Sequence, residues 1–177
     1  TDNPKISASI NLPHETKFID FEDFEVAQSE LEKGDYCAVI IEAIQGVGGV
    51  EMPSTAFLKH LETLCKATGT MLILDEVQAG YGRSGKFFAF QHAGIEPDII
   101  SVAKGMGNGF PIGGILIHPK FKAWHGMLGT TFGGNHLACA AGLAVLEVIE
   151  NEQLMARAEK LGNWLQAEFR QIGQIKK

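Results

Sequence analysis

The sequence has little positive charge and few cysteines. Its 15 Lys and Arg residues are outnumbered by 21 Asp and Glu residues, which leaves a net charge of -6 and no basic cluster. Nucleic acids and anionic membranes attract basic surfaces, so this balance argues against either partner. The three cysteines, Cys37, Cys65 and Cys139, are widely spaced in apolar surroundings. We expect them to be reduced core residues of a cytoplasmic protein, because disulfide frameworks need paired cysteines.

Long hydrophobic runs, secretion signals and metal-binding motifs are also missing. The longest apolar stretch, Leu137 to Leu146, is shorter than the span of about 20 residues that crosses a membrane. The first ten residues, TDNPKISASI, do not have the basic and apolar segments of a signal peptide. The six histidines show no tight metal-ligand spacing, so we expect no metal site. The chain starts without methionine and ends without an obvious terminating element, so we expect a piece of a longer protein.

Short apolar runs alternate with helix-like segments along the chain. Each run is apolar without strict alternation, as expected of strands buried on both faces. These runs are Tyr36 to Ala43, Thr70 to Val77, Asp98 to Lys104 and Gly113 to Pro119. The alternation is typical of helices covering a parallel sheet. The sequence therefore predicts an α/β fold with a mostly parallel sheet and flanking helices.

Capping residues mark the ends of four predicted helices. The clearest helix starts after Ser54, stops before Gly69 and has a continuous apolar face. That face consists of Phe57, Leu58, Leu61, Leu64 and Cys65. We expect the other helices at residues 23–33, 136–149 and 152–172. The helix at residues 136–149 follows the cap Asn135 and is almost wholly apolar, which predicts that it is completely buried. The helix at residues 152–172 is amphipathic.

The segment GYGRSGKF, residues 80–87, matches two nucleotide-binding patterns. It fits GxGxxG of dinucleotide-binding folds and GxxxxGK of phosphate loops, so a nucleotide hydrolase using Gly80 to Lys86 is the alternative function. A phosphate loop needs Ser or Thr after its lysine, whereas this chain has Phe87. A dinucleotide site needs an acid at a strand end, whereas Glu96 lies in a turn beside a proline. We therefore interpret both matches as coincidences in a glycine-rich loop.

Asp75 and Lys104 each end a predicted strand. If these strands are parallel neighbours, both side chains emerge at the carboxyl edge of the sheet, where ligands of such sheets bind. A lysine and a carboxylate at one crevice suit pyridoxal phosphate, because the amine bonds the aldehyde and the carboxylate keeps the ring nitrogen protonated. The two residues alone leave open a buried ion pair that supports the fold.

Three segments around this pair form a recognisable set of motifs. They are IIEAIQGVGGV, LILDEVQAGYGRSGKFFAFQHAGIEPDIISVAKGMGNGFPIGG and GTTFGGNHLACAAGLAVLEVI. Together they resemble the class III aminotransferases of the acetylornithine/ornithine type. The resemblance implies part of the large domain of a type I pyridoxal-phosphate-dependent transferase. Residues 1–150 would form its central part, and residues 151–177 a helix leading towards a missing small domain. It also implies a homodimer with active sites shared between subunits.

The resemblance implies specific tasks for six residues. Lys104 would be the Schiff-base lysine and the acid/base, and Asp75 would pair with the pyridine nitrogen. Gln78 would bond near the phenolic oxygen, and Val77 would pack on the ring. Thr131 would reach the cofactor phosphate of the neighbouring subunit. Beside it, Thr130 would lie near the substrate, although both threonines also suit a turn.

The sequence departs from the family pattern in one functional motif. Many relatives read E-P-[IV]-Q-G-E-G-G where this chain has EAIQGVGG, so Ala43 replaces the proline and Val47 replaces the second acid. In relatives that acid neutralises a substrate-binding arginine. We expect transamination from ornithine or an N-acylated ornithine to 2-oxoglutarate. A 4-aminobutyrate or other ω-amino acid transaminase and a non-catalytic dimerisation domain are the alternatives, and we expect the fragment alone to be inactive.

Overall fold

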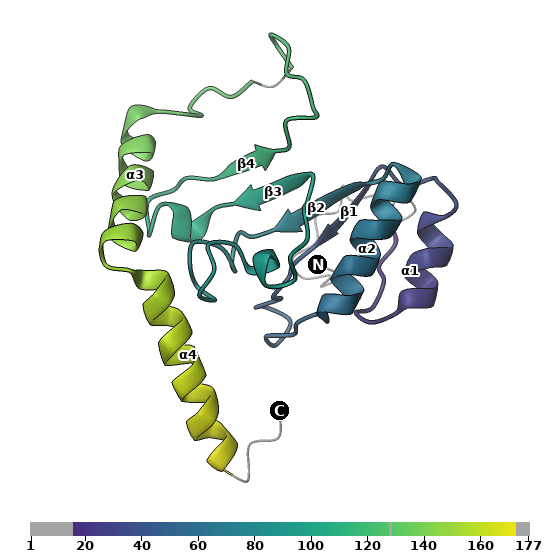
Figure 1. The fold of residues 1–177 in the computed structure, drawn as a ribbon. Helices are drawn as coiled ribbons and strands as arrows, with labels where there is room; N and C mark the ends of the chain where they lie inside the picture. Colours follow the sequence, from purple (N-terminus) through teal and green to yellow (C-terminus); the bar gives the residue numbers. More distant parts are fainter. Residues whose placement is uncertain (1–15, 128, 173–177) are drawn as a thin grey trace.

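A four-stranded sheet forms the centre of the molecule (Figure 1). The computed structural model describes residues 16–127 and 129–172, so the expected absence of a signal peptide in residues 1–10 lies outside the described part. The strands β1 (Ala38–Ile41), β2 (Met71–Asp75), β3 (Ile99–Val102) and β4 (Gly114–Ile117) lie in the order β1-β2-β3-β4. The first three are parallel and β4 runs antiparallel to β3. This confirms the predicted α/β fold with a mostly parallel sheet.

One helix, α2 (Thr55–Thr68), packs against β2, and a second helix, α1 (Phe24–Leu31), packs against α2 (Figure 1). The Ser54 hydroxyl accepts the Phe57 N–H at 3.0 Å, and Gly69 follows with a φ of 77°, a left-handed conformation that suits glycine. All five predicted apolar residues of α2 are buried. They join β2 residues Leu72 and Leu74 in the core, as the sequence predicts.

The connection between β2 and β3 is irregular and is held by one buried carboxylate. Glu76, fully buried, accepts the Ala89 and Phe90 N–H groups at 2.9 Å each, at the start of the 3₁₀ turn Ala89–His92. These bonds satisfy two backbone donors that the turn leaves unpaired. Burial raises the pKa of Glu76, and the two donated hydrogen bonds oppose that rise. Glu76 therefore fixes the middle of the connection to the end of β2.

The helix after the glycine-rich region is less buried than the sequence predicts. In α3 (His136–Asn151) only Ala138, Gly142 and Ile149 are buried. Asn135 caps this helix as expected, accepting the Ala138 N–H at 2.9 Å. Its exposed apolar residues are Leu137, Leu143, Leu146 and Val148. The expectation of complete burial is wrong for this chain, because no described element covers the outer side of the helix.

The last helix, α4 (Leu154–Gln171), extends away from the sheet (Figure 1). None of its residues is buried: Leu154 and Ala158 are half-buried, and the rest of its predicted apolar side is exposed. The exposed residues include Leu161, Trp164, Leu165 and Phe169. No helix among residues 16–127 and 129–172 is long and apolar enough to cross a membrane.

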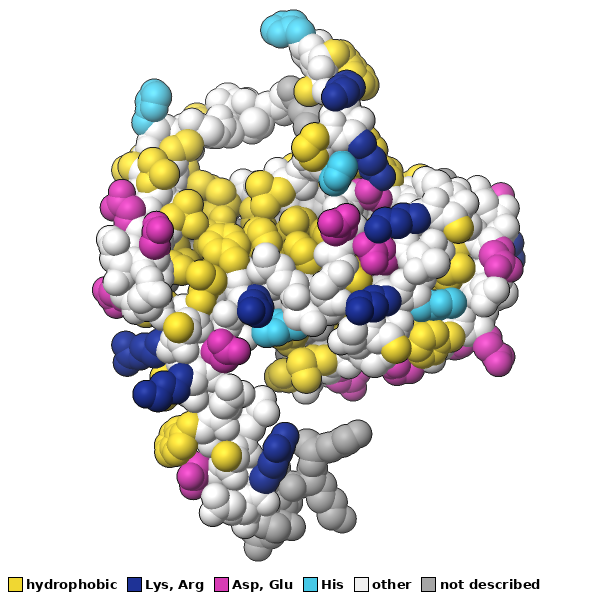
Figure 2. Space-filling model, in the orientation of Figure 1, with side chains coloured by type: hydrophobic (Ala, Val, Ile, Leu, Met, Phe, Trp, Pro, Cys, Tyr) yellow, Lys and Arg dark blue, Asp and Glu magenta, His cyan; other side chains and the backbone are white. Residues whose placement is uncertain are grey.

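Other burial predictions are wrong as well. The strands are not buried on both faces, since Ile40 of β1 is 66% exposed and half-buried residues alternate with buried ones along β2. All four residues of β4 are exposed, because β4 is the outer strand and no described element covers its faces. Cys37 and Cys139 are exposed, and only Cys65 lies in the core, where burial raises the pKa of its thiol to about 11. Figure 2 shows the result, a wide gathering of hydrophobic side chains between α3 and the sheet. Sequence patterns mark such residues as apolar but do not say which part of a protein covers them.

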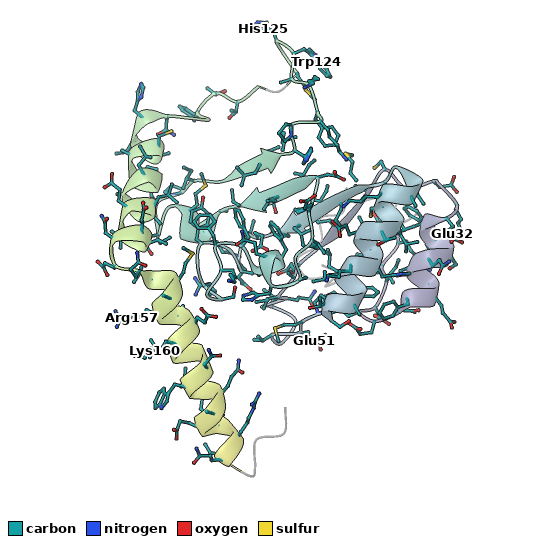
Figure 3. The ribbon with its side chains drawn as sticks, viewed as in Figure 1. Glu32, Glu51, Trp124, His125, Arg157 and Lys160 are labelled. Atoms are coloured by element: carbon teal, nitrogen blue, oxygen red, sulfur yellow. The ribbon has the colours of Figure 1, made fainter. Side chains whose placement is uncertain are left out.

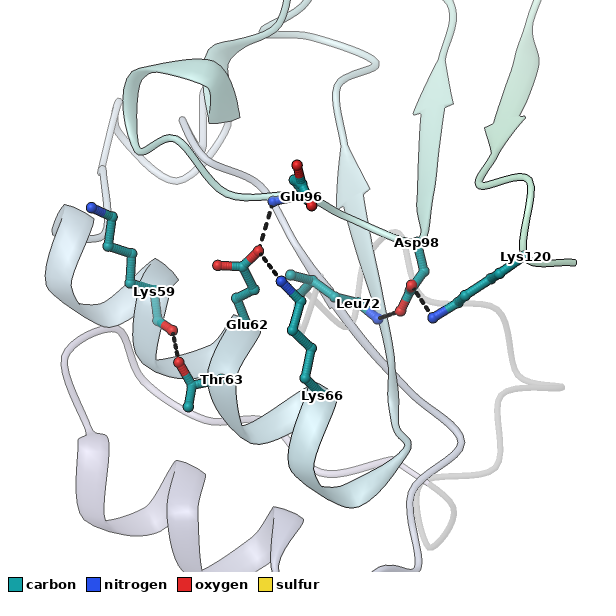
Figure 4. A network of polar contacts seen from close by, with 8 residues as sticks. All are labelled: Lys59, Glu62, Thr63, Lys66, Leu72, Glu96, Asp98 and Lys120. Carbon is teal, nitrogen blue, oxygen red and sulfur yellow. Dashed lines mark hydrogen bonds and ion pairs between the residues drawn. The ribbon is translucent and has the colours of Figure 1, made fainter.

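A network of ion pairs and hydrogen bonds lies at the amino edge of the sheet, where the parallel strands begin (Figure 4). Glu62 accepts both the Lys66 ammonium at 2.8 Å and the Glu96 N–H at 2.9 Å. Asp98 accepts the Leu72 N–H at 2.9 Å and pairs with Lys120, which follows β4. Burial opposes ionisation of Asp98, but the bonds from Lys120 and Leu72 prevail and lower its pKa. These contacts lie at the sheet edge opposite Asp75.

Candidate active site

Three ionisable side chains follow three neighbouring strands at the carboxyl edge of the sheet. Glu42 follows β1, Asp75 ends β2, and Lys104 comes two residues after β3. Because β1, β2 and β3 are parallel, their carboxyl ends lie together at one edge. The predicted neighbouring strands behind the Asp75 and Lys104 pair are thus confirmed.

The Asp75 carboxylate is held through one of its two oxygens. Its Oδ1 accepts the Val77 N–H at 2.9 Å and the Ser101 hydroxyl at 3.0 Å. Among the described residues no donor bonds Oδ2. Asp75 is half-buried, and Oδ1 is the oxygen that these two bonds hold in place.

Lys104 begins a 3₁₀ turn with unusual backbone geometry. Its φ is 44°, in the left-handed region that non-glycine residues rarely adopt, and its carbonyl accepts the Gly107 and Asn108 N–H groups at 3.1 Å each. Backbone strain of this kind is concentrated at functional sites. The side chain lines an open hollow of about 440 Å³ together with Arg83 and residues 105 and 108–112. The ion pairs of the described residues do not include Asp75 with Lys104, which weakens the purely structural interpretation.

Glu42 shares the electrostatic environment of this pair. Burial raises the pKa of Glu42, the negative charge of Asp75 raises it further, and the positive charge of Lys104 lowers it. Asp75 and Lys104 are therefore both close enough to shift the pKa of Glu42.

Gln78 and Val77 lie directly after Asp75 at the end of β2. The Val77 N–H is one of the two Asp75 donors. The Gln78 side chain lies against Gly46, where an added Cβ would come within 1.7 Å of Oε1. This glycine lets the loop after β1 approach the loop after β2. Arg83, which sequence reasoning missed, donates its Nε–H to the Gln78 carbonyl at 3.1 Å and also lines the hollow.

Thr130 and Thr131 lie in the exposed loop between β4 and α3, and neither lines the hollow beside Lys104. This loop extends away from the sheet, with Trp124 and His125 projecting near its tip (Figure 3). The Thr130 hydroxyl accepts the Gly133 N–H at 3.2 Å, as a turn former would. Within this chain the structure does not bring the threonines to Asp75 and Lys104.

The glycine-rich segment 80–87 lacks the architecture of a phosphate loop. No helix begins at its end, since the next element is the short 3₁₀ turn at Ala89. Gly82 and Gly85 have φ values of 81° and 91° and pack against Met155 and Glu159 of α4. The glycines thus serve tight turns and close packing.

The residues at this edge fit pyridoxal phosphate. Lys104 lines an open hollow, and Asp75, which has one oxygen without a described donor, ends the neighbouring strand but does not itself line the hollow. An aromatic aldehyde with a basic ring nitrogen needs both groups. No cluster of three His, Cys, Asp or Glu residues suited to a metal ion exists in the described part of the chain.

Comparison with known proteins agrees with this geometry. The family model for aminotransferase class III matches residues 4–177. The acetylornithine aminotransferase of Methanosarcina acetivorans is 43% identical over 84% of this chain and 37% of its own length. That of Vibrio cholerae is 38% identical over 97% of this chain and 41% of its own. The chain thus spans about two fifths of these relatives.

Solved structures show the same fold. The ornithine aminotransferase of Plasmodium yoelii matches 89% of this chain and 43% of its own with a TM-score of 0.81 and 35% identity. The acetylornithine aminotransferase of Elizabethkingia anophelis matches 86% of this chain and 39% of its own with a TM-score of 0.78 and 38% identity. With its strand-end lysine and aspartate in place, the chain belongs to the class III aminotransferases, which are pyridoxal-phosphate-dependent enzymes.

Proposed function

We propose that this chain is the central part of a cytoplasmic transaminase that moves an amino group from ornithine or an N-acylated ornithine to 2-oxoglutarate. The observation that carries the proposal is the placement of Asp75 and Lys104 at the ends of neighbouring strands, with Lys104 lining an open hollow. Relatives named acetylornithine and ornithine aminotransferases support the substrate class. Residues 1–150 would be the centre of the large domain, and residues 151–177 would lead to a small domain.

The chain's own residues would divide the work at the site. Pyridoxal phosphate, when bound, supplies an electron sink for the carbon that carries the substrate's amino group. The Lys104 amine would bond the cofactor aldehyde, yield to the donor amine, and then move a proton at that carbon. Asp75 would hold the ring nitrogen through Oδ2. Val77 and Gln78 would contact the ring and its phenolic oxygen.

The proposed enzyme is a homodimer whose subunits complete each other's sites. Thr131 lies on an exposed loop that extends away from the sheet, where it could reach the cofactor phosphate of a second subunit with Thr130 near the substrate. The uncovered apolar residues of α3 and β4 support further contacts with chain beyond these 177 residues. We therefore expect the 177 residues alone to be inactive as a transaminase.

The amino donor is the least constrained part of the proposal. Val47, at the position of the second acid in many relatives, is 76% exposed on the loop after β1. An apolar side chain there cannot neutralise a substrate-binding arginine. We therefore propose a donor panel of N-acetylornithine, ornithine and 4-aminobutyrate, each at equal concentration with 2-oxoglutarate.

Borohydride trapping tests the cofactor chemistry directly. The full-length protein that carries this chain would be incubated with pyridoxal phosphate, reduced and digested, and its peptides would be mapped by mass spectrometry. We expect a pyridoxyl group on Lys104, and none on Lys86 or on the variant Lys104→Ala. A folded protein that binds ATP through residues 80–86 and gains no pyridoxyl group would instead favour the nucleotide hydrolase.

A further inference from the structure

Ser101 lies beside Asp75 on the neighbouring strand. The two residues are register partners of the parallel pair β2 and β3, and the Ser101 hydroxyl donates to Asp75 Oδ1 at 3.0 Å. Both side chains are half-buried, so solvent competes only partly for this bond. Ser101 also precedes Lys104 on the same segment, since β3 ends at Val102. The serine that bonds Asp75 thus lies on β3, and Lys104 follows shortly after the end of that strand.

Two donors converge on a single oxygen of Asp75. The terminal torsion of an aspartate is broad, so a carboxylate without fixed partners turns freely about its last bond. The Val77 N–H approaches Oδ1 from the connection after β2, and the Ser101 hydroxyl approaches it from β3. Rotation of the carboxylate would break both bonds. The Val77 donor belongs to the backbone, so the Ser101 donor is the one that a side-chain substitution can remove.

We propose that Ser101 is a positioning residue that holds Oδ1 of Asp75 so that Oδ2 is presented to the cationic ring nitrogen of the cofactor. This inference rests on the proposed function. In this arrangement Oδ1 of Asp75 bonds the protein and Oδ2 bonds the cofactor. Ser101 itself touches neither substrate nor cofactor and acts through the orientation of Asp75.

The test compares substitutions at this position in the full-length protein that carries this chain. Ser101→Thr keeps a hydroxyl. Ser101→Val introduces a side chain of nearly the same shape as threonine but without the hydroxyl, so the two variants form a matched pair, and both residues suit a strand. Ser101→Ala removes the hydroxyl with the smallest change in volume, and Ser29→Ala removes an exposed hydroxyl from α1 as a control. Each variant would be assayed for pyridoxal phosphate dissociation, for the pH dependence of the bound cofactor's absorbance, and for kcat and KM.

The hydroxyl, not the shape, should decide the result. Supporting residues of a site typically contribute about tenfold, so Ser101→Val and Ser101→Ala should each lower kcat and weaken cofactor binding about tenfold, with KM for the amino donor changed less than about twofold. In Ser101→Val and Ser101→Ala, the pH dependence of the bound cofactor's absorbance should differ from that of the wild-type protein. Ser101→Thr and Ser29→Ala should match wild type in all three measurements.

The results would distinguish a failure of the Ser101 proposal from a failure of the proposed transaminase function. If Asp75→Asn impairs the enzyme while Ser101→Val behaves like Ser101→Thr, the positioning function of Ser101 is wrong and the transaminase stands. If Ser101→Val only lowers thermal stability and leaves kcat and cofactor affinity unchanged, the serine is merely structural and the inference again fails. A wild-type protein that binds no pyridoxal phosphate overturns the proposed function together with the inference.

Discussion

Some residues around the Asp75 side chain can be predicted from the sequence, and others cannot. Asp75 and Lys104 can be found because each ends an apolar run, and parallel strands bring such ends together. The bond from Ser101 could have been anticipated only after aligning the two strands residue by residue, because register decides which side chains are neighbours. The Arg83 bond to the Gln78 carbonyl lies in an irregular connection, where no periodicity guides a prediction.

We predict that Asp75→Asn lowers kcat of the full-length enzyme about 10²- to 10³-fold, as expected when a preorganised electrostatic partner is lost. The amide is the same size, so it should leave the fold intact. Its uncharged oxygen is a weak partner for a protonated ring nitrogen. Steady-state kinetics and thermal unfolding would measure the two effects, and an unchanged kcat would show that Asp75 is not the partner of the ring nitrogen.

A second prediction concerns the close contact between Gly46 and Gln78. An alanine Cβ at residue 46 would lie 1.7 Å from Gln78 Oε1, the far end of a flexible side chain that can move away. We expect Gly46→Ala to leave thermal stability nearly unchanged and to lower kcat/KM as much as Gln78→Ala does. A double-mutant cycle tests this, because the double variant should be no worse than Gln78→Ala alone. Additive losses would show that the glycine acts independently of Gln78.

At the scale of elements, the caps, the apolar faces and the burial of α2 were predictable, but the burial of other elements was not. Ser54, Gly69 and Asn135 cap their helices as expected, because local backbone chemistry decides where a helix begins and ends. The burial of α3 and β4 was mispredicted, because burial depends on which other segments cover an apolar surface. The connection between β2 and β3 is held by long-range bonds that the carboxylates of Glu76 and Glu62 accept from its backbone.

We predict that Glu76→Ala destabilises the full-length protein by about 3 kcal/mol, because it strands two buried N–H groups and leaves a cavity. Urea unfolding would measure the change in free energy. Glu168→Ala, at an exposed position of α4, is the control and should change it by less than about 0.5 kcal/mol. A loss for Glu76→Ala no larger than the control's would show that the connection is held by other contacts.

The same carboxyl gives a prediction about pH. Burial raises the pKa of Glu76 above its ordinary 4.5, so the folded protein holds this proton more tightly than the unfolded chain does. Its contribution to stability should therefore decline as the pH rises from about 4.5 through the raised pKa, and then level off. Glu76→Gln cannot titrate and should remove that decline from the profile of unfolding free energy against pH. A profile with the same slope in both proteins would contradict this assignment.

At the scale of the whole molecule, the exposed apolar area is more than a free-standing domain normally shows. Exposed residues on three elements contribute, among them Leu116 of β4, Leu143 of α3 and Trp164 of α4. The family and the fold could be predicted from the sequence, because motifs and strand order are carried by short segments. What covers this area could not, because the chain matches only about two fifths of its relatives.

We predict that the isolated 177-residue chain self-associates at micromolar concentration, because large exposed apolar patches favour association. Sedimentation velocity would show species larger than the 19.2 kDa monomer. Leu116→Lys with Leu143→Lys should shift the distribution towards monomer. The control Gln166→Lys adds charge at an exposed polar position and should have no such effect. A wild-type chain that sediments as a monomer would contradict the prediction.

The antiparallel direction of β4 has a genetic consequence. Because β4 runs opposite to β3, the chain leaves it at the amino edge, where Lys120 pairs with Asp98, and the loop bearing Thr131 departs from the edge opposite Lys104. In the proposed homodimer each lysine would then work with the threonine of the other subunit. Two inactive alleles, Lys104→Ala and Thr131→Ala, would complement when expressed together, since a mixed dimer has one site with both residues intact. Two alleles damaged at the same residue would not.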